Sequence, residues 1–127
     1  MPSAADRTQA ITETVHRYID LVATGSVDEL VELYADDATV EDPVGGEVHI
    51  GRRAIHGFYS AVSGVERTCE LVSLRVAGHE AAFQFRLTVV TGERRMVIEP
   101  IDVMVFDHRG KVSAMKSYWS AADVSYL

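Results

Sequence analysis

The stretch Ile101-Asp102-Val103-Met104-Val105-Phe106 is an apolar run with a single carboxylate inside it. A short run rich in β-branched and aromatic residues is typical of a β-strand. Side chains alternate between the two faces of a strand, so Asp102 shares one face with Met104 and Phe106, and the odd-numbered residues share the other. An ionised carboxylate among such neighbours is costly unless it is paired, hydrogen-bonded or kept neutral by a raised pKa.

Two interpretations of Asp102 follow from this pattern. In the first, it is an ordinary buried aspartate satisfied by an arginine or by backbone N–H groups, or it lies at the exposed edge of its strand. In the second, it is a carboxylic acid held neutral so that its O–H can donate a hydrogen bond inside an apolar cavity. The strand alone leaves both open, and the choice depends on whether the rest of the chain supplies a partner for this acid.

Composition narrows the class of protein. With 127 residues and 14.0 kDa, the chain has the size of one domain over residues 1–127, and 47% hydrophobic residues are typical of a folded one. A formal net charge of −7 argues against nucleic acid and anionic membranes as partners. The N-terminus lacks signal-peptide character and no run is long enough to span a membrane. The single cysteine, Cys69, fits a reducing cytoplasm.

The first helix is predicted from Ser3, its N-cap, to about Ala23, with Gly25 as its stop. Apolar residues recur along it at helical spacing, and Tyr18 belongs to that stripe, so its hydroxyl points inward. A buried tyrosine normally needs a hydrogen-bond partner. The pattern alone favours a core aromatic residue whose hydroxyl meets a backbone carbonyl.

Two shorter helices follow in the N-terminal half. Ser26 and Glu29 form a capping box, and apolar residues at helical spacing carry the predicted second helix through Tyr34 to a stop at Asp36-Asp37. The third helix is predicted from Arg52 to about Val62.

Between these helices, a short strand is predicted over Thr39-Val40-Glu41-Asp42 and is stopped by Pro43. Aspartate before proline often only starts a turn. An acid fixed at the end of a strand beside a loop is also well placed to act as a general base. Both interpretations of Asp42 stand at this point.

The second half of the chain is predicted to be a β-meander. Strands are expected over 68–77 and 81–90, then in a long strand that begins after Thr91-Gly92-Glu93 and carries Asp102, and finally over 111–119. No further element is expected in the tail 120–127. Helices followed by strands indicate an α+β class, in which a curved, mainly antiparallel sheet covers three helices and encloses an apolar pocket.

Several chemistries lack their sequence patterns. The five histidines show no metal-binding spacing, and the chain has neither a glycine-rich phosphate loop nor a nucleophile elbow. No metal or cofactor is therefore expected. What remains is a set of inward tyrosines and two carboxylates in unusual positions.

These residues carry a resemblance to a known family. The segment Tyr34-Ala-Asp-Asp-Ala-Thr-Val-Glu-Asp-Pro-Val-Gly45, together with Arg17-Tyr18, Phe58-Tyr59 and Pro100-Ile-Asp102, closely resembles the bacterial Δ5-3-ketosteroid isomerases of the NTF2-like superfamily. The resemblance covers nearly the whole chain, through Gly110-Lys-Val and Tyr118-Trp119. It implies the NTF2-like cone fold, which by itself hosts many unrelated activities.

The resemblance also implies a mechanism. Asp42 matches the family's general base, which moves a proton from C4 to C6 of a 3-oxo-Δ5-steroid through a dienolate. Tyr18 and a neutral Asp102 match the two donors of the oxyanion hole. Ketosteroid isomerases are an established example of a carboxylic acid kept neutral for this purpose, so this assignment comes with the resemblance.

The resemblance assigns supporting residues and partners too. Tyr34 and Tyr59 match aromatic residues that support the Tyr18 hydroxyl, while Phe85, Met115 and Trp119 fall where the family lines its steroid pocket. It implies a small-molecule steroid as substrate and a homodimer as the assembly.

Two other functions remain possible on this fold. An epoxide hydrolase or a dehydratase would need an Asp-Arg-Asp arrangement or catalytic histidines, and no arginine flanks Asp42 or Asp102. A non-catalytic steroid or lipid carrier would keep the cavity alone and would have no reason to retain both acids. The substitution Asp42→Asn should separate the carrier from the isomerase, because it should abolish isomerisation and leave steroid binding nearly intact.

Overall fold

The computed structural model describes residues 3–127, so the first two residues of the N-terminal segment, Met1 and Pro2, lie outside it. The described residues form three α-helices: α1 (Ala4–Thr24), α2 (Val27–Val31) and α3 (Arg52–Ser60). They also form a short 3-10 helix, η1 (Ala121–Asp123), and eight strands: β1 (Tyr34–Glu41), β2 (Val48–Ile50), β3 (Glu66–Ala77), β4 (Glu80–Thr91), β5 (Arg94–Ile98), β6 (Ile101–Phe106), β7 (Val112–Tyr118) and β8 (Val124–Tyr126).

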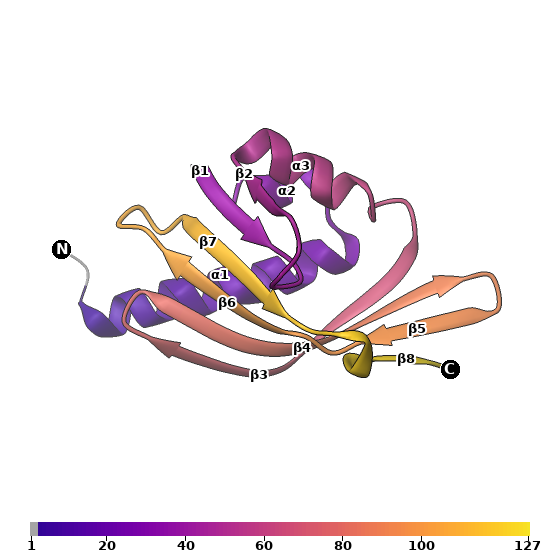
Figure 1. Ribbon diagram of the computed structural model, residues 1–127. Coiled ribbons are helices and arrows are strands. Elements are labelled where there is room, and N and C mark those ends of the chain that lie inside the picture. The colour runs from indigo at the N-terminus through magenta and orange to yellow at the C-terminus, as the bar shows by residue number, and fades with distance from the viewer. Residues whose placement is uncertain (1–2) are drawn as a thin grey trace.

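The eight strands make one curved sheet with the order β2-β1-β7-β6-β4-β5-β8, and β3 pairs with the other side of β4. All pairings are antiparallel except β1 with β7. One half of β4 pairs with β6 and the other half with β5, so the β5–β8 end extends away from the rest of the sheet (Figure 1). The α+β class and the curved, mainly antiparallel NTF2-like cone expected from the sequence are confirmed.

Helix α1 lies along the concave side of the sheet and packs against β3 and β4 (Figure 1). Its start follows the predicted capping box, since the Ser3 side chain accepts from the Asp6 N–H and Asp6 accepts from the Ser3 N–H. It ends at Gly25, where a Cβ atom would lie 2.4 Å from Leu21 Cδ2. The apolar face of this helix packs into the core and directs Tyr18 into the interior.

The predicted second helix is too long. It ends at Val31, and Tyr34 begins strand β1 instead of closing a helical turn. The reason is a long-range pairing, because β1 runs parallel to β7 with Tyr34 opposite Val112, and the Val112 N–H donates to the Leu33 carbonyl. The Tyr34 carbonyl also accepts hydrogen bonds from the half-buried guanidinium of Arg52.

The long strand predicted around Asp102 is in fact two strands, β5 and β6, separated at Glu99-Pro100. Proline has no N–H to donate to a ladder, and the two strands have different outer partners, β8 and β7. The tail that was expected to be irregular supplies η1 and β8. Strand β2, which was also not predicted, pairs with β1.

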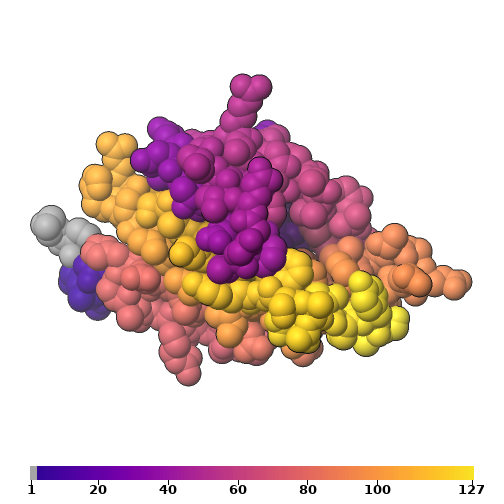
Figure 2. Space-filling model, in the orientation of Figure 1, coloured from indigo at the N-terminus to yellow at the C-terminus, as the bar shows by residue number. Residues whose placement is uncertain are grey.

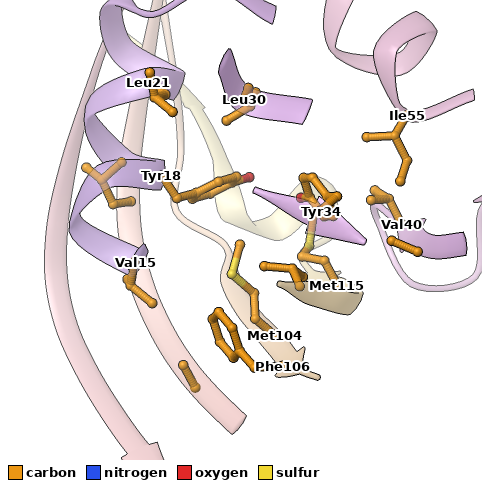
Figure 3. Packing of buried hydrophobic residues seen from close by; sticks show 14 of the residues in the cluster. Val15, Tyr18, Leu21, Leu30, Tyr34, Val40, Ile55, Met104, Phe106 and Met115 are labelled. Carbon is orange, nitrogen blue, oxygen red and sulfur yellow. The ribbon is translucent and has the colours of Figure 1, made fainter. Parts of the chain in front are cut away.

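The core lies between α1, the short helices and the concave face of the sheet. Figure 3 shows Tyr18 from α1 and Tyr34 from β1 pointing toward each other above Met104, Phe106 and Met115. On β6, Asp102, Met104 and Phe106 are buried and Ile101 is exposed, as the alternation predicted. Within residues 3–127, none of the helices has both the length and the apolar character needed to cross a membrane.

Candidate active site

Three tyrosine hydroxyls form a buried hydrogen-bonded chain. The Tyr59 hydroxyl lies 3.1 Å from that of Tyr18 and 2.6 Å from that of Tyr34. The residues come from α3, α1 and β1 respectively, and all three are buried. A hydroxyl has one donor and two acceptor sites, so Tyr59 can bond both neighbours while the Tyr18 hydroxyl keeps bonding capacity.

These tyrosines stay protonated far beyond neutral pH. Burial raises the pKa of Tyr18, Tyr34 and Tyr59 well above the ordinary value, because the charged phenolate is poorly solvated in the interior. The charge of Asp102 would raise each of these pKa values further, which means that its carboxyl lies within electrostatic reach of the chain. The Tyr18 hydroxyl is thus a neutral hydrogen-bond donor next to a second acid.

Asp102, the second residue of β6, is completely buried opposite Phe83 on β4 and Ser117 on β7. Burial raises its pKa well above the ordinary value, and the negative charge of Asp42 acts in the same direction. The nearby hydroxyl of Ser117 acts in the opposite direction and lowers the pKa of Asp102, although it makes no hydrogen bond with the carboxyl. Within residues 3–127, neither carboxyl oxygen has a hydrogen-bond partner. Burial without a partner favours the neutral form of such a carboxyl, in which the O–H can donate a hydrogen bond.

Asp42 follows the last residue of β1 and has a different environment. Its Oδ1 atom accepts a hydrogen bond of 2.7 Å from Trp119 Nε1, and the side chain is half-buried. Burial raises the pKa of Asp42, while the hydrogen bond from Trp119 and the nearby Ser117 and His49 lower it. The result is a carboxylate held in one orientation whose basicity is increased by its surroundings.

A cavity of about 400 Å³ joins these groups. Its wall includes the side chains of Tyr18, Asp42, Tyr59, Phe85 and Trp119, and it continues along apolar residues of α1, α2, β4 and β5. This volume falls in the range of small-molecule sites, which are mostly apolar with a few polar groups. Figure 2 shows the molecule hollowed between the α3 segment in magenta and the orange and yellow C-terminal strands.

Three predicted site residues lie behind the cavity wall. Met115 was expected to line the pocket, but it pairs with Met104 of β6 and is packed in the core, away from the cavity wall (Figure 3). Tyr34 is also fully buried and reaches the cavity only through the Tyr59 hydroxyl. Asp102 is buried among the β-strand side chains beside the tyrosine chain.

Four polar residues of the cavity wall were not predicted as site residues, namely Ser26, Ser63, Arg67 and Ser117. Ser117 lies two residues after Met115 on β7 and therefore on the same face of the strand, so its direction could have been found from the sequence. Arg67 begins β3 after a turn, and no pattern in the sequence indicates that it faces the cavity.

The arrangement is suited to proton transfer at carbon. The Asp42 carboxyl and the Tyr18 phenol line one apolar cavity, and the buried carboxyl of Asp102 lies behind its wall, beside the tyrosine chain. Such donors stabilise an oxyanion that forms when a proton is removed next to a carbonyl. Among residues 3–127, no three His, Cys, Asp or Glu side chains are grouped as metal ligands.

Comparisons with known proteins identify the family of this chain. Residues 15–115 match the family model described as a SnoaL-like domain. The chain is 47% identical over 115 residues to a steroid Delta-isomerase of Nocardioides simplex, covering 90% of this chain and 93% of that protein.

Two more distant relatives have other names. The chain is 29% identical to epoxide hydrolase LasB of Streptomyces lasalocidi, over 81% of this chain but only 45% of that protein. The solved structure of SalBIII, an epoxide hydrolase/cyclase-like enzyme in pyran ring formation in polyether salinomycin, superimposes with a TM-score of 0.87 at 29% identity, covering 94% of this chain and 97% of SalBIII. The chain therefore belongs to the SnoaL-like domain family, and within it to the group that includes the Nocardioides simplex steroid Delta-isomerase.

Proposed function

We propose that this enzyme is a steroid Δ-isomerase that converts 3-oxo-Δ5-steroids to 3-oxo-Δ4-steroids. The observation that carries the proposal is the fully buried carboxyl of Asp102, which has no hydrogen-bond partner among residues 3–127 and lies beside the tyrosine chain. Such a group is costly for stability, since a polar atom buried without a partner loses its hydration. A substrate oxygen that accepts a hydrogen bond from the Asp102 carboxyl would supply the missing partner when the substrate binds.

The proposed reaction is an internal proton transfer. Asp42 removes a proton from C4, and the electrons of that C–H bond form the dienolate, whose negative charge lies on the C3 oxygen. This oxygen accepts hydrogen bonds from the Tyr18 hydroxyl and from the protonated Asp102. Asp42 then returns its proton to C6, so the double bond moves into conjugation and the enzyme is regenerated.

The roles of the two acids differ because their environments differ. Asp42 must be ionised, and Trp119 supports this state by donating to its carboxylate. Asp102 must be protonated, and burial in β6 favours that form. Tyr59 and Tyr34 support Tyr18 through the hydroxyl chain, and Phe85 and Trp119 contribute apolar wall against the steroid rings.

Epoxide hydrolysis is the second candidate, because two relatives at 29% identity carry names of that kind. That chemistry needs an acid and an arginine that together position water. Within residues 3–127, the arginine of the cavity wall is Arg67, whose guanidinium is bonded to backbone carbonyls and not to Asp42. Asp42 is bonded to the indole N–H of Trp119, which supports the isomerase.

A homodimer is part of the proposal. Ile101 and Tyr118 are opposite each other on β6 and β7, and each is about half exposed on the outer face of the sheet. Exposed apolar side chains on a sheet face are suited to packing against a second copy. Light scattering after gel filtration should give twice the chain mass of 14.0 kDa. The cytoplasmic location expected from the single cysteine stays a prediction.

The test is the ultraviolet absorbance of the purified protein mixed with 5-androstene-3,17-dione, which reports the conjugated enone as it forms. We expect fast growth with the wild type and almost none with Asp42→Asn. The matched control is Asp37→Asn, which removes the same charge from an exposed position on β1, the strand that Asp42 follows, and should leave the rate unchanged. No growth above buffer with the wild type would reject the isomerase, and equal rates for Asp42→Asn would reject this base. Steroid binding without turnover would indicate a carrier.

A further inference from the structure

The cavity has a fixed positive charge at the end away from the two acids. Arg67, near the start of β3, lines the cavity and is half-buried. Its Nε donates to the Val22 carbonyl at 2.6 Å, and its Nη1 donates to the carbonyls of Ser63 and Val65 at 3.0 and 2.9 Å. These bonds connect the end of α1 to the turn before β3 and hold the guanidinium in one place.

These contacts do not use all of the donors. A guanidinium has five N–H groups, and the bonds above account for Nε and for the two on Nη1. Among the described residues, the two N–H groups of Nη2 have no acceptor, and no carboxylate lies within 4 Å of the guanidinium. The carbonyls at the C-terminal end of α1 compensate part of the charge. A half-buried cation with free donors in a cavity wall is suited to an anionic group of a ligand.

The position of Arg67 fits a long, rigid ligand. Arg67 pairs with Val89 on β4, and Phe85, near the acids, is four residues away, which is roughly 13 Å along the strand. On the facing helix, Tyr18 is about one turn, roughly 6 Å, before Val22. The wall between the two ends is apolar and includes Leu21, Leu87 and Ile98. The separation of roughly 13 Å along β4 is comparable to the long dimension of a fused four-ring nucleus.

We propose that Arg67 binds a carboxylate carried by the end of the steroid that is remote from the 3-ketone. The substrate class is then a 3-oxo-Δ5-steroid acid, with the ketone oxygen at Tyr18 and the side-chain carboxylate on Nη2 of Arg67. This inference rests on the proposed isomerase function for the direction of the substrate. Arg67 does not touch the reacting atoms, so it determines specificity and not the chemical step.

The first experiment uses the wild-type enzyme alone and compares two substrates. One is a 3-oxo-Δ5-steroid whose C17 side chain ends in a carboxylic acid, and the other is the methyl ester of that acid. We expect kcat/KM to be roughly tenfold higher for the acid, the range for a hydrogen bond to a charged group. The difference should appear in KM and decrease as the salt concentration rises. Equal values for the acid and the ester in the wild type would overturn the proposal without any variant.

The second experiment removes the charge. Arg67→Gln should lose the preference for the acid, so that the ratio of kcat/KM for the acid to kcat/KM for the methyl ester falls to about one. Arg75→Gln is the matched control, because Arg75 is exposed on the same strand and outside the cavity, and it should keep the preference. Retention of the preference by Arg67→Gln would overturn the proposal. If that variant does not fold, Arg67→Lys keeps the charge with different geometry and should show a reduced preference.

Failure of this inference can be distinguished from failure of the proposed function. Turnover of 5-androstene-3,17-dione without any preference for the acid would reject the role of Arg67 and leave the isomerase in place. If no steroid is isomerised, calorimetric titration with the acid and the ester still measures whether the cavity prefers the carboxylate. Equal dissociation constants in that titration would reject the carboxylate site.

Discussion

Asp42 and Asp102 are the same residue type near the same cavity, and their surroundings differ in almost every respect. Asp42 lies at the end of a strand, is half-buried and accepts a hydrogen bond from Trp119. Asp102 lies near the start of β6, is fully buried and has no partner among residues 3–127. The difference in burial and in hydrogen-bond partners favours a different protonation state for each acid, so one is suited to accept a proton and the other to donate a hydrogen bond.

The largest effect expected after loss of the base is that of Asp102. Asp102→Leu removes the donor and should reduce kcat by about 10²–10³, the usual cost of losing one oxyanion-hole donor. Asp102→Asn keeps an N–H donor and should lose less, roughly tenfold. Stopped-flow absorbance with 5-androstene-3,17-dione measures both. Equal losses in the two variants would mean that hydrogen-bond donation is not what Asp102 contributes.

The same acid should make stability depend on pH. Because the folded-state pKa of Asp102 is raised, the folded protein binds more protons than the unfolded chain above the unfolded pKa. Stability from this group is therefore present at low pH and is lost as pH rises toward the folded pKa, by up to about 1.4 kcal/mol per pH unit.

Asp102→Asn has no such proton. Its free energy of unfolding relative to wild type should rise from pH 4 to pH 7, measured by urea denaturation at several pH values. Asp37→Asn, which changes an exposed carboxylate on β1, serves as the control and should show no such trend. A constant difference between Asp102→Asn and wild type across this range would show that Asp102 is ionised in the folded protein.

Trp119 provides a smaller test of the comparison from the side of Asp42. The hydrogen bond from Nε1 lowers the pKa of Asp42, so Trp119→Phe should raise it and move the acid limb of the pH profile of kcat/KM to higher pH. A hydrogen bond to a charged group is worth about 1.5 kcal/mol or more, which corresponds to a shift of roughly one pH unit. Activity well above this limb should change little. An unchanged acid limb would show that the group that titrates there is not Asp42.

The sequence predicted features that depend on local pattern. The alternation of β6 placed Asp102 with Met104 and Phe106 on the buried face, and the stripe of α1 directed Tyr18 inward. The inward direction of both follows from side-chain geometry alone. That they approach one another depends on the curvature of the sheet and came only with the resemblance.

Errors occurred where distant pairing overrides local pattern. Tyr34 fits a helical stripe, yet pairing with β7 makes it the first residue of a strand. The C-terminal tail has weak strand character, and β8 forms because β5 offers it an edge. The break at Pro100 was visible in the sequence, since proline inside a run argues against a continuous strand. Arg67 was missed because its direction depends on the end of a different element, α1.

The smallest expected effect is at Tyr34, the end of the hydroxyl chain that lies behind the cavity wall. Tyr34→Phe removes the 2.6 Å bond to Tyr59 but leaves the 3.1 Å contact between Tyr59 and Tyr18. Kinetic measurements should show a loss in kcat of less than about tenfold, and urea unfolding should show a loss of about 1 kcal/mol, the usual net value of one hydrogen bond. Tyr59→Phe breaks both contacts and should cost more in each measurement. If Tyr34→Phe were as damaging as Tyr59→Phe, the three hydroxyls would act as one unit. The expected decrease in effect with distance from the cavity would then be wrong.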